Sequence, residues 1–167
     1  MKVETYKIND WEELETGLLI DENENWILVK HIPVDYIIDG FKIYNKEFVG
    51  ERIHSDTEQR IEKVLKLKTV QDIKPNNFEF FETIGLLKWV ENNYGLFEFQ
   101  DDDASEVIYG KMNRIEHKNL IIDMIHSDGS VEENYNYEFD IDEIRVITFE
   151  SDYHQSIGLL WKDWLKN

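Results

Sequence analysis

The sequence predicts an α+β protein, mainly β, made of two similar small units of bent sheet or barrel. Each unit is followed by a helix, and a further helix links the two. Two observations predict this architecture. The motif Ser-Asp-x-x-Gln-x-Ile at residues 55–61 recurs at residues 151–157, 96 positions later. Around these motifs, short segments follow the two-residue period of β-strands, so the repeat is one of β-rich units.

The recurrence divides the chain into three parts. These are a first β-rich repeat at residues 1–70, a linker and connecting helix at 71–93, and a second β-rich repeat at 94–167. The offset of 96 extends back to Phe41, and from Ile32 toward the N-terminus the halves align at an offset of 93, which places Gly17 on Gly110. The change of offset falls where the second copy carries the turn sequence 127–130, and turns tolerate insertions. The linker contains Pro75 and few apolar residues, which is typical of a boundary.

Strands are predicted where short segments alternate between apolar and polar residues or are mostly apolar. Residues 135–141 alternate strictly, which is typical of a half-buried strand. Residues 120–125 are mostly apolar and predict a more central strand. The strands predicted in this way include residues 3–8, 27–29 and 48–53 in the first repeat and 96–100, 120–125, 135–141 and 145–149 in the second. Asp-Gly pairs at residues 39–40 and 128–129 indicate turns.

Each repeat ends in a predicted helix that begins at the shared Ser-Asp. Ser55 and Glu58 form a capping-box pattern, in which the serine caps a backbone N–H and the glutamate reaches back. Apolar residues at helical spacing then predict the buried face of each helix. They are Ile61, Val64 and Leu65 in the first helix and Ile157, Leu160, Trp161 and Trp164 in the second.

The linking helix is predicted over residues 79–93. Its expected buried residues are Phe80, Ile84 and Leu87. Gly95 follows the helix and can adopt the left-handed conformation that commonly ends one.

Five short strands and one helix in each repeat resemble the layout of the Sm-like and SH3-like small barrels, where a helix caps a five-stranded sheet. The resemblance covers most of each repeat and depends on the strand order and on Gly17 and Gly110. It implies a tandem duplication of such a barrel. Sm-type rings would imply RNA binding, but this chain departs from them because it lacks basic loops.

The net charge argues against two classes of partner. The chain has 36 acidic and 18 basic residues, a formal net charge of −18. Binding to nucleic acid or to anionic membranes depends on Lys and Arg, so we expect neither as a partner. The acidity either serves solubility alone or attracts a basic partner.

Other features of the sequence predict a cytoplasmic protein. It contains no cysteine, so no disulfide framework forms. No apolar run approaches the roughly 18 residues of a membrane span. The first residues lack the apolar segment of a secretory signal.

No motif in the sequence assigns a catalytic residue, a metal site or a cofactor. The five histidines lack the spacing of metal ligands and are expected to have structural roles. No nucleophile elbow or phosphate-binding loop is present. An enzyme acting on a small molecule would require a deep pocket in which histidine and carboxylate groups converge.

Two acidic turns carry the partner-binding hypothesis. They occupy comparable places, each after the first strand of its repeat, and the candidate residues are Trp11, Glu12, Glu13, Asp101, Asp102 and Asp103. Trp is enriched at interface hot spots, so Trp11 is either an anchor for a partner or a core residue at a strand end. We expect a non-enzymatic acidic binding protein, such as an immunity-type inhibitor of a basic toxin. The alternative is a structural module that self-associates or scaffolds a complex.

Overall fold

The computed structural model describes residues 1–132 and 135–167 as one ten-stranded antiparallel sheet with three α-helices. The first half contains β1 (Val3–Ile8), β2 (Glu15–Glu22), β3 (Trp26–His31), β4 (Phe41–Asn45), β5 (Val49–Ile53) and α1 (Asp56–Leu67). The second half contains α2 (Thr83–Tyr94), β6 (Phe97–Gln100), β7 (Ile108–Glu116), β8 (Asn119–Met124), β9 (Tyr137–Asp140), β10 (Val146–Phe149) and α3 (Asp152–Leu165). The predicted class, α+β and mainly β, is confirmed.

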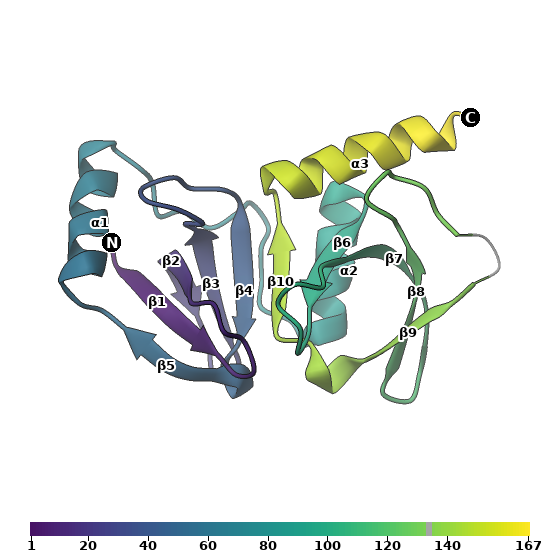
Figure 1. The fold of residues 1–167 in the computed structure, drawn as a ribbon, viewed down its shortest axis with the longest axis horizontal. Coiled ribbons are helices and arrows are strands. Elements are labelled where there is room, and N and C mark those ends of the chain that lie inside the picture. Colours follow the sequence, from purple (N-terminus) through teal and green to yellow (C-terminus); the bar gives the residue numbers. More distant parts are fainter. Residues whose placement is uncertain (133–134) are drawn as a thin grey trace.

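The sheet runs continuously through both halves in the order β5-β1-β2-β3-β4-β10-β6-β7-β8-β9. Within each half the last strand pairs with the first, and the others follow in chain order. The antiparallel pairing of β4 with β10 joins the halves, and Figure 1 shows these two strands side by side at the middle of the molecule. We refer to this junction of β4, β10 and β6 as the seam.

The second strands of both halves carry a glycine followed by a β-bulge. The register of β2 shifts between Leu19 and Asp21, and that of β7 shifts between Met112 and Arg114. At Gly17 a Cβ atom would come within 2.5 Å of the Val29 side chain. The neighbouring strand therefore approaches too closely for a larger residue, and the bulge then bends the strand.

The largest hydrophobic cluster is shared by both halves. Alternate residues of the seam strands, such as Ile43, Ile147 and Phe99, face helix α2. This helix packs against β6 and β10. Figure 1 shows α1 at the outer end of the first half and α3 along one side of the second.

Helix α2 begins later than predicted. It starts at Thr83 rather than at residue 79, and its buried residues are Leu86, Leu87 and Val90. Phe80 therefore precedes the helix, where its ring packs edge-on against that of Phe78, a residue of the shared core. The predicted end is confirmed, because Gly95 caps the helix at a φ of 91°.

The other two helices begin at the predicted serines. Ser55 is the N-cap of α1, and the backbone N–H and hydroxyl of Ser55 donate to Glu58 Oε2 at 2.8 and 2.5 Å. Ser151 caps α3 by accepting from the backbone N–H of His154. The predicted apolar stripe of α3 is wrong at Leu160, which is 45% exposed, because Gly158 and not Leu160 faces Leu96.

Among residues 1–132 and 135–167, no helix has both the length and the apolar character needed to cross a bilayer.

Candidate functional site

The two acidic turns predicted from the sequence lie together. One turn connects β1 to β2 and the other connects β6 to β7. The indole Nε1–H of Trp11 donates to the main-chain oxygen of Asp101 at 2.9 Å, so a single hydrogen bond links them. Between them is a groove of about 460 Å³, and its lining includes the exposed carboxylates Glu12, Glu13, Asp102 and Asp103. We call these four carboxylates the acidic surface.

Trp11 holds the turns in place from below this surface. It is only 6% exposed and belongs to the same hydrophobic cluster as Tyr6 and Ile8. Because a buried indole N–H needs an acceptor, the bond to Asp101 also satisfies this group. The buried indole thus holds the second turn in place through Asp101, and little of the ring is accessible to a partner.

Arg145 fixes the first turn against the second half. Its Nη2 lies 2.7 Å from Asp10 Oδ2, and its Nε donates to the main-chain oxygen of Asn9 at 3.2 Å. The side chain is 3% exposed, and its guanidinium stacks 4.1 Å from the centre of the Phe48 ring. The turn is thus held by a buried cation while the acidic surface faces outward.

In the second turn, the pKa values of Asp101 and Asp103 are shifted in opposite directions. Burial raises the pKa of the Asp101 carboxyl, and the charge of Asp102 acts in the same sense. Hydrogen bonds from the hydroxyl and N–H of Ser105, at 2.6 and 2.9 Å, lower the pKa of Asp103. The Asp103 carboxylate is therefore both ionised at neutral pH and fixed in orientation.

A second cluster of polar side chains lies at the seam, on the sheet face opposite α2. Four of them are direct cross-strand neighbours: Lys42 of β4, Thr148 of β10, Glu98 of β6 and Tyr109 of β7. Directly opposed residues share a face, so these side chains form one row. The row lines a pocket of about 550 Å³, which we call the seam pocket.

Glu98 is the least satisfied polar group in the seam pocket. The residue is 5% exposed, and its Oε1 has no hydrogen-bond partner among the described residues. The hydroxyl of Thr148 is likewise without a partner in the part of the chain that the structure describes. Burial raises the pKa of Glu98 to about 7, although Tyr109 and Lys42 act in the opposite sense.

Lys42 is engaged by another carboxylate. Its Nζ forms an ion pair with Glu15 Oε1, and the Nε2 of His31 lies 3.8 Å from Glu15 Oε2. Burial, together with the nearby charge of Lys42, lowers the pKa of His31 to about 3. His31 is therefore neutral at physiological pH.

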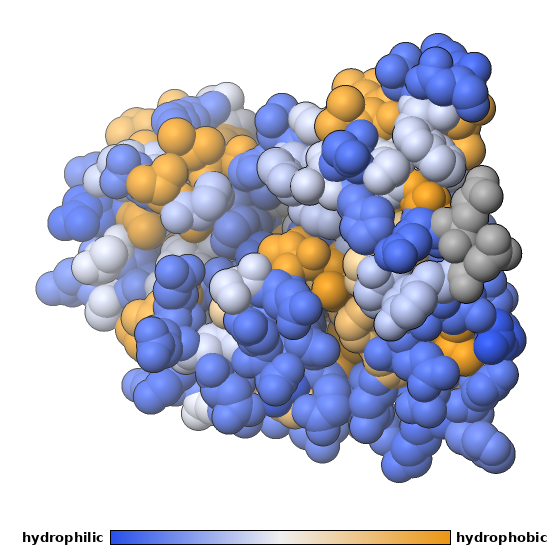
Figure 2. Space-filling model, turned by 45° about the vertical axis from the view of Figure 1, so that its right-hand side comes forward, coloured by the Kyte–Doolittle hydropathy of each residue, from blue (hydrophilic) through white to orange (hydrophobic). Residues whose placement is uncertain are grey.

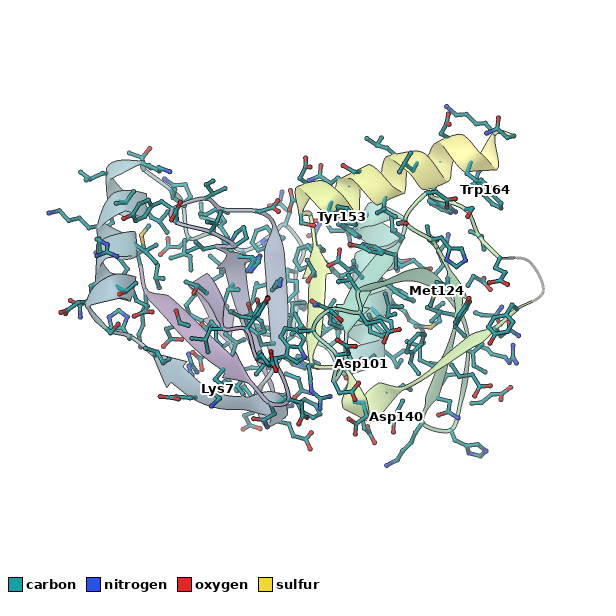
Figure 3. The ribbon with its side chains drawn as sticks, viewed as in Figure 1. Lys7, Asp101, Met124, Asp140, Tyr153 and Trp164 are labelled. Carbon is teal, nitrogen blue, oxygen red and sulfur yellow. The ribbon has the colours of Figure 1, made fainter. Side chains whose placement is uncertain are left out.

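The rim of the seam pocket comes from segments distant in sequence. His126 and Ser127 belong to the turn after β8, and Tyr153 to the first turn of α3. Figure 3 shows Tyr153 at the start of α3 and Asp101 past the opposite end of β6. Ser105 lines both the groove between the acidic turns and the seam pocket, so the two are contiguous.

His154 has a structural role. It is 1% exposed, and its Nε2 lies 3.0 Å from the Leu96 oxygen while its Nδ1 accepts from the Glu150 N–H at 3.2 Å. Burial lowers the pKa of His154. Within residues 1–132 and 135–167, no three His, Cys, Asp or Glu side chains are grouped so that they could hold a metal ion.

Sequence reasoning missed the seam pocket. Its central residue stands in the run Phe97-Glu98-Phe99-Gln100, of which all four residues are buried. A carboxylate between two core phenylalanines in a predicted strand indicates a polar group on a covered face. That signal could have identified Glu98, although not the strand opposite it.

The chain was compared with family models, curated protein sequences and solved structures, and none of them matches it.

Proposed function

We propose that this protein binds a basic protein partner through the acidic surface, as an immunity-type inhibitor of a cationic toxin domain would. The observation that carries the proposal is the hydrogen bond between Trp11 and Asp101, which joins two separate acidic turns. Charges that would be scattered on separate loops are thereby concentrated around one groove.

The electrostatics of the acidic surface suit rapid recognition of a cation. Complementary charge raises association rates at low salt, and its effect falls as salt screens it. The turns are also held before any partner arrives, by Trp11 and by the buried Arg145. A preorganised surface loses less entropy on binding than a mobile one.

We further propose that the two halves are copies of one small-barrel unit. The shared strand order and the bulges that follow Gly17 and Gly110 support this proposal. Under it, the two acidic turns are equivalent, since each connects the first strand of its half to the second. The acidic surface would then combine the same turn from both copies.

A charge-neutral variant tests the proposed function. The variant carries Glu12→Gln, Glu13→Gln, Asp102→Asn and Asp103→Asn. A matched control makes the same change of net charge at four exposed carboxylates elsewhere, through Glu24→Gln, Glu47→Gln, Glu51→Gln and Asp163→Asn. Each protein is used to capture partners from lysate of the source cell and from a panel of basic nuclease domains, at low and high salt.

We expect both the wild type and the control to retain a basic protein at low salt and to release it at high salt. The variant at the acidic surface should retain it at least tenfold less, because several charge pairs are lost. If no basic protein distinguishes the variant from the control, the proposed function is wrong.

Self-association is the second candidate function. It is favoured by the apolar side chains that α3 exposes, Leu159, Leu160 and Leu165. Figure 2 shows hydrophobic patches at the upper right, toward the C-terminal end of the chain, and others at the upper left and near the centre of this face. Native mass spectrometry separates the candidates, since a homo-oligomer that resists salt supports assembly, and a monomer with a salt-sensitive partner supports inhibition.

A further inference from the structure

Two residues that line the seam pocket each have a buried polar atom that lacks a hydrogen-bond partner within the described chain. These atoms are Glu98 Oε1 and Thr148 Oγ1. A buried carboxylate oxygen without a hydrogen-bond partner is unfavourable, and such atoms are uncommon in native proteins. Their persistence on the wall of a cavity of about 550 Å³ indicates that something else supplies the donors. This volume lies within the range of small-ligand sites.

The charges around the pocket indicate which donor fits. The nearest cation is Lys42 of β4, but its ammonium is ion-paired with Glu15 of β2, two strands away. His31 lies beside them, half-buried and neutral at physiological pH. Glu98 therefore has no dedicated counter-charge among the described residues, and a cationic ligand would provide one.

We propose that the seam pocket binds a guanidinium group, with Glu98 and Thr148 as its acceptors. The two residues are directly opposed across the β6–β10 pair, so one planar group can donate to both side chains at once. The rings of Tyr109 and Tyr153, whose centres lie 5.8 Å apart, line the same pocket. A guanidinium stacks on aromatic rings more readily than an ammonium does.

This inference does not depend on the proposed function, although the pocket adjoins the groove between the acidic turns through Ser105. The guanidinium could belong to a free small molecule or to an arginine side chain of a protein. Both sources present the same chemistry to Glu98, so the experiment includes an arm for each.

The test is isothermal titration of the full chain at pH 8 with three probes. Butylguanidinium represents the group alone, butylurea is its neutral analogue of similar shape, and acetyl-Gly-Arg-Gly-amide represents an arginine side chain. We expect the two cations to bind at one site and butylurea to bind at least tenfold more weakly, because charge-assisted hydrogen bonds are the stronger kind. Tighter binding of the peptide would assign the site to a protein side chain, and tighter binding of butylguanidinium to a free ligand.

Variants connect binding to the pocket. Glu98→Gln should weaken guanidinium binding about 10- to 100-fold, and Thr148→Val by a few-fold. Glu24→Gln, at an exposed position, should leave the affinity unchanged. The variant that neutralises all four carboxylates of the acidic surface should bind the guanidinium probes as the wild type does. Failure of this inference can therefore be distinguished from failure of the proposed function.

The pH profile is a second readout. The pKa of Glu98 near 7 predicts about tenfold weaker binding at pH 6 than at pH 8, because only the carboxylate attracts the cation. The other titratable groups of the pocket are Lys42, Tyr109, Asp39, His31, His126 and Tyr153. The affinity for the guanidinium probes is therefore also measured against pH in Glu98→Gln, where it should no longer change between pH 6 and pH 8. Absence of binding by both cations, or unchanged affinity in Glu98→Gln, would overturn the inference.

Discussion

Glu98 shows how the environment of one residue sets its protonation. Its neighbours in β6 face the core, and its own side chain faces a covered pocket where Oε1 finds no partner among the described residues. Burial disfavours the charged form and moves the pKa from 4.5 to about 7. Between these values the folded protein binds more protons than the unfolded chain does. The free energy of unfolding therefore falls as the pH rises through this window.

Glu98→Gln should remove this loss of stability. At pH 8 the variant should be more stable than the wild type by about 1–3 kcal/mol, since it has no charge to bury. Below pH 4.5 the difference should vanish, because both side chains are then neutral. Denaturant unfolding between pH 4.5 and pH 8 measures it, with Glu24→Gln as the exposed control. A variant that is less stable than the wild type at pH 8 would contradict the assignment.

At the scale of elements, the start of α1 is linked to the sheet as well as capped. Glu58 closes the capping box with Ser55, and its Oε1 also accepts from the hydroxyl of Thr5 in β1 at 2.7 Å. Burial alone would raise the pKa of Glu58, but the hydrogen bonds from Ser55 and Thr5 outweigh it and lower the pKa to about 2. One carboxylate therefore stabilises the helix and its packing on β1.

Glu58→Gln should lower the free energy of unfolding by about 1–2 kcal/mol at pH 7, as loss of a capping interaction does. The folded-state pKa is lowered, so this contribution is present above pH 4.5 and is lost as the pH falls toward 2. The difference between variant and wild type should shrink over the same window. Glu79→Gln, at an exposed position before α2, serves as control. An equal effect at both positions would exclude a specific role for the cap.

At the scale of the whole molecule, strand pairing and a shared hydrophobic cluster join the halves, in addition to the chain that connects them. β4 pairs with β10, and the largest hydrophobic cluster includes Ile43 from the first half and Phe99 from the second. Arg145 and Trp11 add two polar contacts between the halves. Separating the halves would expose both the core face of the seam and a buried cation.

We expect the molecule to unfold in one transition, because the largest hydrophobic cluster is shared by both halves and the clusters confined to one half are smaller. Differential scanning calorimetry checks this through the agreement of the calorimetric and van't Hoff enthalpies. Two resolved transitions, or a van't Hoff enthalpy near half of the calorimetric one, would show that the halves unfold independently.

Trp11→Phe tests the link between the two acidic turns. The change keeps an aromatic ring in the core but removes the donor to Asp101, and should cost about 1–2 kcal/mol of stability. It leaves the net charge at −18. Binding of a basic partner should nevertheless weaken, because the turns are no longer held together. Amide NMR shifts that change only around residue 11, and not around 101–105, would contradict this role.

Local signals in the sequence were enough to predict most elements. β1 was predicted at residues 3–8, and α1 and α3 were predicted to begin at Ser55 and Ser151, because alternation and caps depend on neighbouring residues alone. The predicted start of α2 was wrong because Phe80, which fits a helical pattern with its neighbours, packs with Phe78 against the tertiary core instead. Contacts distant in sequence outweighed local propensity there.

The sequence by itself determined the mainly β class, the starts of α1 and α3 and the two acidic turns as separate features. Only the tertiary structure decided that Trp11 joins those turns into one surface and that Glu98 faces Thr148 in a pocket. Both outcomes depend on β4 pairing with β10 and on the register of β6 against β10. Nothing local in the sequence specifies which strand of one half meets which strand of the other, because that choice depends on burial of the shared core.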